Sequence, residues 1–598
     1  MPVEPQKSAF LPELSNEVRE AQTVKEKPIL VILGNPPYAG HSKNKGKWIT
    51  TAIDGYKYTF GRVQTETDAD GNPVFSDVKK PLGEKNPKWL NDDYVKFIRF
   101  AQLKMDEVEE GVVGIITNHS WLDNPTFRGM RQSLLRSFDQ IYLVDLHGST
   151  KPKELVPEGK ENENVFDIQK GVAIALLVKK KDAEQGVWHT DIWGSRLSKY
   201  QECAEAEIST IEWSRPKPFS PYFMLSAVDW TGWEEYGQWW QIADSLSAAS
   251  DKRQIFSANV LGFQTHRDHF AVAFDRQEML SRVRDMCDTS KSDQVLRDLY
   301  FLKDNRDWQL KNARESLQKA ENPERPIIDC AFRPFDDRPC YFGPEFMDYP
   351  RRELLDHVAW QQNLQLLVSR QIGTGSWRHS LVVETPANDC TVSDASSEAN
   401  YAFPLWLYDL TGTKSENLSP DFRAFLDRGY DHHYSLEEIL GYIYAVLHAP
   451  AYRSHYAAFL RIDFPRIPFA EKAKDFEVLS LLGWALVQAH LLHDLPRRSL
   501  ANYHGKGANE VEHVRWSAED ERISINKTQS FAPVPEAVWN FHIGGYQVID
   551  KYLKSRKERM LSLDEINQVG RIADALAFTN EQIARIDTAY AQAFPNRG

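Results

Sequence analysis

The stretch Ile-Leu-Val-Ile-Leu-Gly-Asn-Pro-Pro-Tyr, residues 29–38, joins five apolar residues to a glycine and a proline-rich corner. The apolar run has the length and branching of a buried parallel strand. Neither Pro36 nor Pro37 can donate to a β-ladder, so the strand must end before them. In open α/β sheets, ligands bind at the carboxyl ends of the strands. We therefore expect residues 35–38 to form a rigid corner at the binding edge of a sheet.

Apolar segments alternate with helical patterns over the first 185 residues. Short strands are predicted at 29–33, 112–116, 141–144 and 172–178, and amphipathic helices at 93–109 and 127–136. Such alternation is typical of a mostly parallel sheet covered by helices. The polar segment between Ala39 and Lys88 has no clear period, so we expect it to be irregular.

Beyond residue 185, the composition and the predicted secondary structure change twice along the chain. Residues 186–320 are rich in tryptophan and charge and are expected to be a connecting, partly helical region. Residues 321–420 combine short strands with turn signals, and helical spacing follows at 434–493 and 545–590. These patterns predict three regions, namely 1–185, 186–320 and 321–598.

Composition excludes several classes of protein. The 598 residues are 42% apolar, and no run approaches the 18 or more apolar residues of a membrane span. Residues 1–27 are polar and charged, unlike a secretory signal, so we expect a cytoplasmic protein. The five cysteines form no CxxC pair, which favours neither a zinc site nor a disulfide framework.

Net charge alone is unfavourable for nucleic-acid binding. The chain carries a formal charge of −13, and phosphate contacts need basic surface. A binding face can nevertheless occupy a single domain. Two stretches are locally basic, and their members are Lys551, Lys554, Arg556, Lys557 and Arg559 in one and Arg333, Arg338, Arg351, Arg352, Arg370 and Arg378 in the other.

The tetrapeptide Asn35-Pro36-Pro37-Tyr38 resembles the catalytic motif of amino-directed DNA methyltransferases. Later phrases follow it in an order similar to that of the γ-class adenine methyltransferases. They resemble even more closely the modification portion of Type ISP and Type IIG restriction–modification enzymes. The phrases lie at 94–98, 111–122, 127–131, 164–166, 262–268, 332–336, 442–448, 463–468 and 544–548.

This resemblance implies a fold and a substrate. It implies that residues 1–185 have an α/β fold with a partial Rossmann-like methyltransferase sheet. It also implies that residues 321–598 form an α+β target-recognition domain with helical spacers. The substrate would be double-stranded DNA, and the target an adenine amine rather than a cytosine amine. Phosphate contacts would position the duplex, and Arg333, Arg338, Arg370 and Arg378 are the candidates for DNA binding.

The chemistry explains the residue types of the corner. A base amine is a poor nucleophile because its lone pair is delocalised into the ring. The Asn35 side-chain oxygen and the Pro36 carbonyl would accept both amine hydrogens, and Pro37 would keep that carbonyl fixed. Tyr38 would stack on a flipped base, which is worth about 1–3 kcal/mol. The competing interpretation is that Asn-Pro-Pro-Tyr is only a turn.

One departure from the family pattern concerns the methyl donor, S-adenosylmethionine. In the γ-class order a glycine-rich turn that holds this cofactor precedes the motif, but residues 1–33 contain no glycine. We therefore assign no cofactor-binding residue and expect the chain to be the C-terminal part of a longer enzyme, or a subunit that needs a partner chain. The nuclease and helicase modules of a full-length Type ISP enzyme would likewise lie elsewhere.

Three other patterns are interpreted as structural. The Gly-x-Gly at Gly373 and Gly375 follows a predicted strand and precedes another, which favours a β-hairpin over a donor site. The segment 40–47 differs from a phosphate-binding loop in its glycine spacing and in having Trp48 where serine or threonine is required. His490 and His493 have no third ligand nearby, so we expect packing or surface histidines and no metal site.

Two further functions stay open from the sequence. The chain can be a non-catalytic DNA-binding specificity subunit, because its donor half is missing. Related motifs also act on protein and RNA amines, although the long region beyond residue 186 favours an extended duplex footprint.

Overall fold

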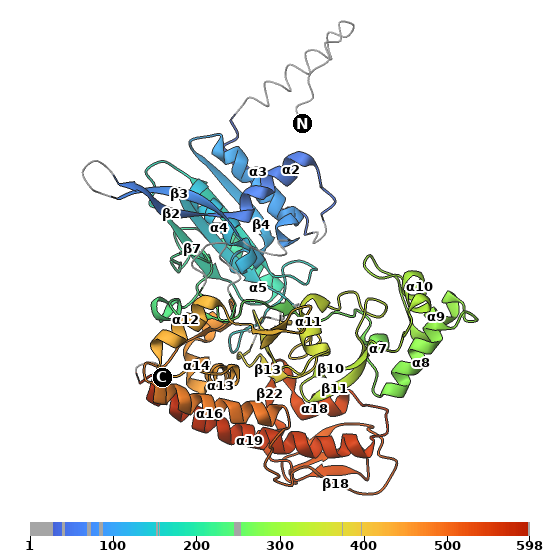
Figure 1. The fold of residues 1–598 in the computed structure, drawn as a ribbon. Helices are drawn as coiled ribbons and strands as arrows, with labels where there is room; N and C mark the ends of the chain where they lie inside the picture. Colours follow the sequence, from blue (N-terminus) through green and yellow to red (C-terminus); the bar gives the residue numbers. More distant parts are fainter. Residues whose placement is uncertain are drawn as a thin grey trace. The chain divides into compact units, whose positions relative to one another are not determined.

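The computed structural model describes residues 28–38, 42–67, 73–82, 88–150, 154, 156–243, 253–373, 375–395 and 398–595 (Figure 1). The chain divides into two compact units. Unit 1 holds the described residues up to Trp230, and unit 2 holds those from Thr231 onward.

Unit 1 is built on a five-stranded sheet with the order β1-β4-β6-β5-β7. Its strands, with a separate hairpin of β2 and β3, are β1 (Val31–Gly34), β2 (Tyr58–Thr67), β3 (Pro73–Pro81), β4 (Gly111–Asn118), β5 (Gln140–His147), β6 (Val172–Lys179) and β7 (Gly186–Asp191). Its α-helices are α2 (Lys47–Asp54), α3 (Asp93–Asp106), α4 (Arg128–Ser137) and α5 (Arg196–Glu205). Short 3-10 turns lie at Gly55–Lys57, Lys88–Asn91, His119–Trp121 and Pro125–Phe127.

All four strands predicted for unit 1 are present, but the first was predicted to be buried and β1 is instead a largely exposed strand at the end of the sheet. The strand directions also differ from the prediction. β1 runs parallel to β4, and β5 runs parallel to β7. β6 lies between β4 and β5 and is antiparallel to both. The predicted mostly parallel sheet is therefore a mixed one, because the chain returns from β5 to β6 through a loop instead of a crossover helix. The carboxyl ends of β1, β4, β5 and β7 share one edge.

The main core of unit 1 covers one face of this sheet. The predicted helices at 93–109 and 127–136 form α3 and α4, and their apolar faces pack against alternate residues of the strands. The buried residues of this core include Tyr94, Ile98, Met105, Val113, Ile115, Met130, Leu134, Ile141, Leu143, Ala175 and Leu177. The period-2 burial of the strands follows from this one-sided cover.

Two predictions about unit 1 are wrong. The segment from Ala39 to Lys88 is not irregular throughout, because its described residues form α2 and the β2–β3 hairpin. Residues 39–41, which include Gly40, lie outside the described part. The predicted boundary at residue 185 is also wrong, because β7 pairs with β5 inside the sheet. Residues 186–320 therefore divide between the two units instead of forming a region of their own.

Unit 2 combines short antiparallel strands with long helices. Its largest sheets have four strands each, in the orders β13-β12-β14-β9 and β18-β21-β20-β19. The strands are β8 (Trp240–Gln241), β9 (Val260–Leu261), β10 (Ile327–Arg333), β11 (Asp336–Tyr341), β12 (Gln365–Ser369), β13 (Ser380–Val383), β14 (Asn400–Pro404), β15 (Trp406–Tyr408), β16 (Lys414–Glu416), β17 (Arg466–Ile467), β18 (Asn502–His504), β19 (Arg515–Ser517), β20 (Arg522–Ser524), β21 (Ser530–Ala532), β22 (His542–Ile543) and β23 (Tyr546–Gln547).

The helices of unit 2 carry the predicted helical segments. They are α6 (Trp233–Tyr236), α7 (Asp268–Ala271), α8 (Arg276–Cys287), α9 (Asp293–Tyr300), α10 (Leu310–Lys319), α11 (Arg352–Ala359), α12 (Pro420–Gly429), α13 (Leu436–His448), α14 (Pro450–His455), α15 (Ala457–Leu460), α16 (Ala473–His490), α17 (Glu536–Trp539), α18 (Val548–Lys554) and α19 (Leu563–Ala593). None of the helices in the described part combines the length and apolar character needed to cross a membrane.

Helices α13 and α16 cross at two glycines. A Cβ atom at Gly483 of α16 would lie 1.9 Å from the carbonyl oxygen of Gly441 in α13, and one at Gly441 would lie 2.4 Å from the oxygen of Ser480. Both distances are far below van der Waals contact with backbone atoms, which cannot rotate away. The close crossing of these helices therefore requires glycine at both positions, and α19 packs against the pair.

We predict that Gly483→Ala destabilises unit 2. The added methyl group must push α13 and α16 apart, and such overpacking costs about 1–3 kcal/mol. Gly570→Ala in α19 is the matched control, because its Cβ would meet no atom closer than 3.5 Å. That control gains about 0.5–1 kcal/mol from helix propensity. Chemical denaturation of both variants measures the difference, and equal stability would contradict the tight crossing.

Candidate functional site

The corner of residues 35–38 lies at the carboxyl end of β1. The strand pairs with β4 as far as Gly34, and the two prolines end the ladder beyond it. Pro36 is buried, whereas Asn35 is exposed and Tyr38 is half-buried. The corner is therefore anchored on one side and open on the other, and its carboxamide is accessible to a ligand.

The Tyr38 hydroxyl bridges the corner and the neighbouring strand. It lies 3.2 Å from Asn35 Oδ1 and 3.4 Å from the carbonyl oxygen of Ile116 in β4, and it donates to these acceptors. Burial raises the pKa of Tyr38 to about 12, so the phenol keeps its proton at neutral pH. The Asn35 oxygen is thereby held as an acceptor that a second donor can reach.

A second aromatic ring borders the corner. Phe166, in the loop between β5 and β6, lies with its ring centroid 6.0 Å from that of Tyr38, and the two planes are inclined by 45°. The buried Asn164 shapes this loop, because its oxygen accepts from the Phe166 backbone N–H at 2.9 Å. Its nitrogen donates to the carbonyls of Gly148 and Lys170. The ring is therefore fixed by a fully bonded amide.

Helix α5 holds the same loop from outside through a buried lysine. The ammonium of Lys199 donates to the carbonyl oxygens of Leu146 and Glu163, at 2.6 and 2.7 Å, and to Asn162 Oδ1 at 3.2 Å. Lys199 is fully buried, and this burial lowers its pKa. Three acceptors compensate a buried ammonium group, so Lys199 ties the end of β5 to the segment that carries Phe166.

Of the arginines predicted to bind DNA, Arg338 is not at the surface. Its side chain is 7% exposed, and its Nη2 donates to Asp336 Oδ2 at 2.6 Å and to Ser555 Oγ at 2.8 Å. Arg556 donates to the other oxygen of Asp336 at 2.8 Å. Burial alone would raise the pKa of Asp336, but the two guanidinium groups lower it. The prediction for Arg338 is wrong, because this residue belongs to a buried ion cluster.

The other three predicted arginines differ in exposure. Arg333 is largely buried, stacks on the Phe332 ring at 3.9 Å and donates to Asn388 Oδ1 at 3.1 Å. Arg370 is also largely buried and donates to Asp463 Oδ1 at 2.7 Å. Arg378 is exposed. Arg378 is therefore the member of this set best placed to contact a macromolecule.

Two of the three patterns interpreted as structural agree with the structure, and the third, at 40–47, begins outside the described residues. Strands β12 and β13 pair antiparallel on either side of Gly373 and Gly375, so the predicted β-hairpin is confirmed. His490 is buried and hydrogen-bonded to Tyr444 and Thr579, and burial lowers its pKa to about 3. His493 is about half exposed and lies 3.6 Å from Glu384. The two histidines are packing and surface residues, as predicted.

Comparisons with known proteins identify a family and a fold. A family model described as the Type ISP C-terminal specificity domain matches residues 254–584, which is more than half of the chain. A comparison with curated protein sequences gave no match.

Three solved structures share the fold at low sequence identity. They are a DrdV–DNA complex (21% identity, TM-score 0.68, 96% of this chain and 58% of that chain), the ATP-dependent Type ISP restriction–modification enzyme LlaBIII bound to DNA (19%, 0.70, 98% and 39%) and a nuclease-deletion mutant of the Type ISP restriction–modification enzyme LlaGI with a DNA substrate mimic (19%, 0.67, 96% and 54%). The chain thus spans between about two fifths and three fifths of the length of these proteins.

We predict that Arg338→Ala destabilises unit 2 and that Arg378→Ala does not. Removing one partner of a buried ion pair costs about 3–5 kcal/mol, because the remaining charge is uncompensated. Arg556 still faces Asp336, so the loss should fall at the lower end of that range. An exposed substitution changes stability by about 0.5 kcal/mol or less. Equal denaturation midpoints for the two variants would show that the buried cluster does not stabilise the fold.

Proposed function

Because the chain belongs to the family of Type ISP C-terminal specificity domains, we propose that it recognises a specific double-stranded DNA sequence in a restriction–modification system. We further propose that unit 1 supplies the corner that holds the target adenine while its exocyclic amine is methylated. The observation that carries this second step is the open, proline-fixed carboxamide of Asn35 beside two aromatic rings.

The adenine amine would take over a hydrogen bond that already exists. In the structure, the Tyr38 hydroxyl occupies the Asn35 oxygen at 3.2 Å. A flipped adenine would donate one amine hydrogen to Asn35 and the other to the Pro36 carbonyl, which draws the nitrogen towards tetrahedral geometry. The displaced Tyr38 hydroxyl keeps the Ile116 carbonyl as an acceptor at 3.4 Å. No buried polar group is left unpaired by the exchange, so base entry carries little desolvation cost at this atom.

The two rings define where the base would lie. A centroid separation of 6.0 Å is already a contact between Tyr38 and Phe166, so a base does not fit between them. The base would stack on the open face of Tyr38, and Phe166 would hold that ring from the other side. Lys199 and Asn164 would act as positioning residues, because they fix the loop that carries Phe166.

The methyl donor would be S-adenosylmethionine, and we assign no residue of this chain to its site. Close approach of backbone to such a cofactor needs glycine, and residues 1–33 have none. β1 is the outermost strand of the sheet among the described residues. Its Val31 and Leu33 are 62% and 77% exposed, and Leu30 just before it is 52% exposed. We propose that further strands, from a longer chain or a partner, pair along this edge and bring the donor site.

The alternative is a specificity subunit without catalytic activity of its own. The same open edge favours it, since the isolated chain then binds DNA but not the methyl donor. DNA binding would use exposed basic residues of unit 2 such as Arg378, and its affinity would fall steeply with salt. Calorimetric titration of the purified chain with S-adenosylmethionine tests whether the donor site is missing from it. Adenine methylation at the native locus distinguishes the two functions, because only the catalytic function makes that methylation depend on Asn35.

We predict that Asn35→Ala, introduced at the native locus, lowers adenine methylation of the host DNA. Loss of a preorganised group that acts in the transition state reduces rates by about 10²–10³-fold. Asn35→Asp keeps the acceptor oxygens and should retain more activity. The native locus supplies any partner, and long-read sequencing of methylated adenines gives the motif and its occupancy.

The matched control is Asn91→Ala, an exposed asparagine of the same unit. Binding of the purified Asn35→Ala protein to the methylated motif should stay within about threefold of wild type, because the corner contributes little to duplex affinity. Methylation at wild-type occupancy in the Asn35→Ala strain would contradict the role of the corner.

A further inference from the structure

Histidine and carboxylate side chains gather at the sheet edge of unit 1. His119 follows β4, Asp145 and His147 end β5, and His189 and Asp191 end β7. The proposed handling of the target base uses none of these side chains. Their residue types are those that bind transition-metal ions through nitrogen and oxygen.

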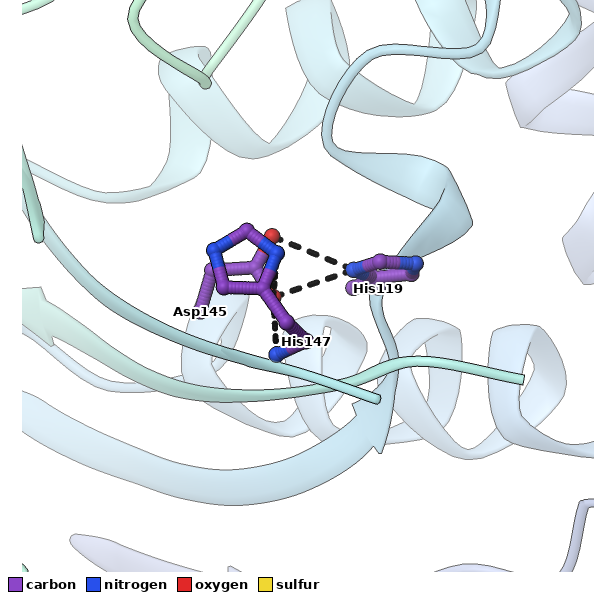
Figure 2. Close-up of side chains that lie close together, drawn as sticks. All are labelled: His119, Asp145 and His147. Atoms are coloured by element: carbon purple, nitrogen blue, oxygen red, sulfur yellow. Dashed lines mark hydrogen bonds and ion pairs between the residues drawn. The ribbon is translucent and has the colours of Figure 1, made fainter. Parts of the chain in front are cut away.

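His119 and His147 are already engaged by carboxylates. Figure 2 shows the His119 ring directed at the Asp145 carboxylate, with Nδ1 3.0 and 3.1 Å from its two oxygens. His147 Nε2 lies 2.9 Å from Asp191 Oδ1, and His147 Nδ1 lies 3.2 Å from Glu154 Oε1. Both histidines therefore act as donors that orient the carboxylates.

His189 is different, because its ring is buried without a hydrogen bond. The residue is 2% exposed, and neither Nδ1 nor Nε2 has a hydrogen-bond partner in the described structure. Asp191 Oδ2 lies 3.9 Å from Nδ1, which is beyond hydrogen-bond distance. A buried polar group without a partner destabilises the fold, because it has lost its hydrogen bonds to water. A ligand that accepts the imidazole lone pair would remove that destabilisation.

Strand register directs the His189 ring towards two carboxylates. Asp145 pairs with Asp191, and Leu143 pairs with His189. Residues two apart on a strand share a face, so His189, Asp191 and Asp145 all lie on the same face of the sheet. One ligand atom from each of the three lies within 4.8 Å of the others.

These separations suit a metal ion after small side-chain rotations. Zn²⁺ lies about 2.1 Å from imidazole nitrogen and carboxylate oxygen, so two ligands at a tetrahedral angle are about 3.4 Å apart. The 3.9 Å between His189 and Asp191 must therefore shorten only slightly. Carboxylates that bind a metal are themselves held by hydrogen bonds from outer-shell groups. His119 and His147 hydrogen-bond to Asp145 and Asp191 in this way.

We propose that Asp145, His189 and Asp191 bind one divalent transition-metal ion, Zn²⁺ by the chemistry of the donors, with His119 and His147 orienting the two carboxylates. The ion would join the carboxyl ends of β5 and β7. Its role is structural, since none of the three ligands belongs to the Asn35 corner. This inference does not depend on the proposed methylation.

There is a physical reason why the sequence did not indicate this site. The ligands come from two strands, and positions 145 and 189 are brought together only by the pairing of β5 with β7. No short-range spacing such as His-x-x-His connects them. A search for ligands that lie close together in the sequence therefore could not find this site.

The test uses the full chain without an affinity tag, stripped of metal by a chelator and then titrated with ZnCl₂. We expect one equivalent of zinc per chain by elemental analysis after dialysis, and a melting temperature that rises by several degrees on zinc addition. Co²⁺ should give visible absorption bands of a nitrogen–oxygen site. Less than a tenth of an equivalent, or a melting temperature unaffected by zinc and chelator, would overturn the proposal.

His189→Phe provides the sharpest variant. Phenylalanine keeps the ring and removes the unpaired nitrogens, so without metal this variant should be at least as stable as the wild type. It should lose the zinc-dependent rise and bind zinc at least tenfold more weakly. Thr190→Val, next along β7, should behave as wild type. If the wild type and His189→Phe bind zinc equally, the ion lies elsewhere and the assignment is wrong.

A second variant covers the case in which His189→Phe does not fold. Asp191→Asn preserves shape at a side chain that is 44% exposed and removes one anionic ligand. It should also weaken zinc binding at least tenfold, and unchanged affinity would count against the site. Asn35→Ala should bind zinc as wild type does, which separates this test from that of the proposed function.

Discussion

The forced exit of the chain from the sheet at Gly34 is the constraint on which the site depends. Parallel pairing with β4 fixes β1 to its last residue, and the prolines that follow cannot continue the ladder. The carboxamide of Asn35 is therefore presented at the strand end instead of being buried between neighbours. Because Tyr38 reaches back to the carbonyl of Ile116, the corner keeps one shape without a ligand.

One loop connects the two sites inferred at this edge. The segment between β5 and β6 carries Phe166, which packs against Tyr38, and Glu154, which bonds to His147. Lys199 of α5 ties the same segment to the end of β5. A metal ion between β5 and β7 would stiffen the strand ends from which this loop departs. We therefore expect metal binding at Asp145, His189 and Asp191 to affect, through this loop, how firmly the Phe166 ring is held against Tyr38.

Local patterns in the sequence predicted several strands and helices of unit 1, because these elements depend mainly on residues near one another in the chain. The strands around residues 29–33, 112–116, 141–144 and 172–178 and the helix at 93–109 are all present. Short apolar runs indicated the strands, and the one-sided apolar face of the helix reflects its burial against the sheet. Properties set by distant pairing were missed. The antiparallel direction of β6, the burial of Arg338 by Arg556 and the orphaned ring of His189 depend on contacts that no short window contains. The role of Lys199 in fixing the loop between β5 and β6 could not be predicted either, because its three acceptors lie 36 to 53 residues away in the sequence.

Photocrosslinking tests the central claim most directly. A duplex that carries the methylated motif, with 5-iodouracil in place of the target adenine, would be irradiated with the protein in its native assembly and the adduct mapped by mass spectrometry. A base that enters the corner of residues 35–38 crosslinks to Tyr38, and Tyr38→Ala abolishes that adduct while DNA binding persists. Adducts confined to unit 2, with none at Tyr38, would contradict the assignment of this corner as the site that receives the base.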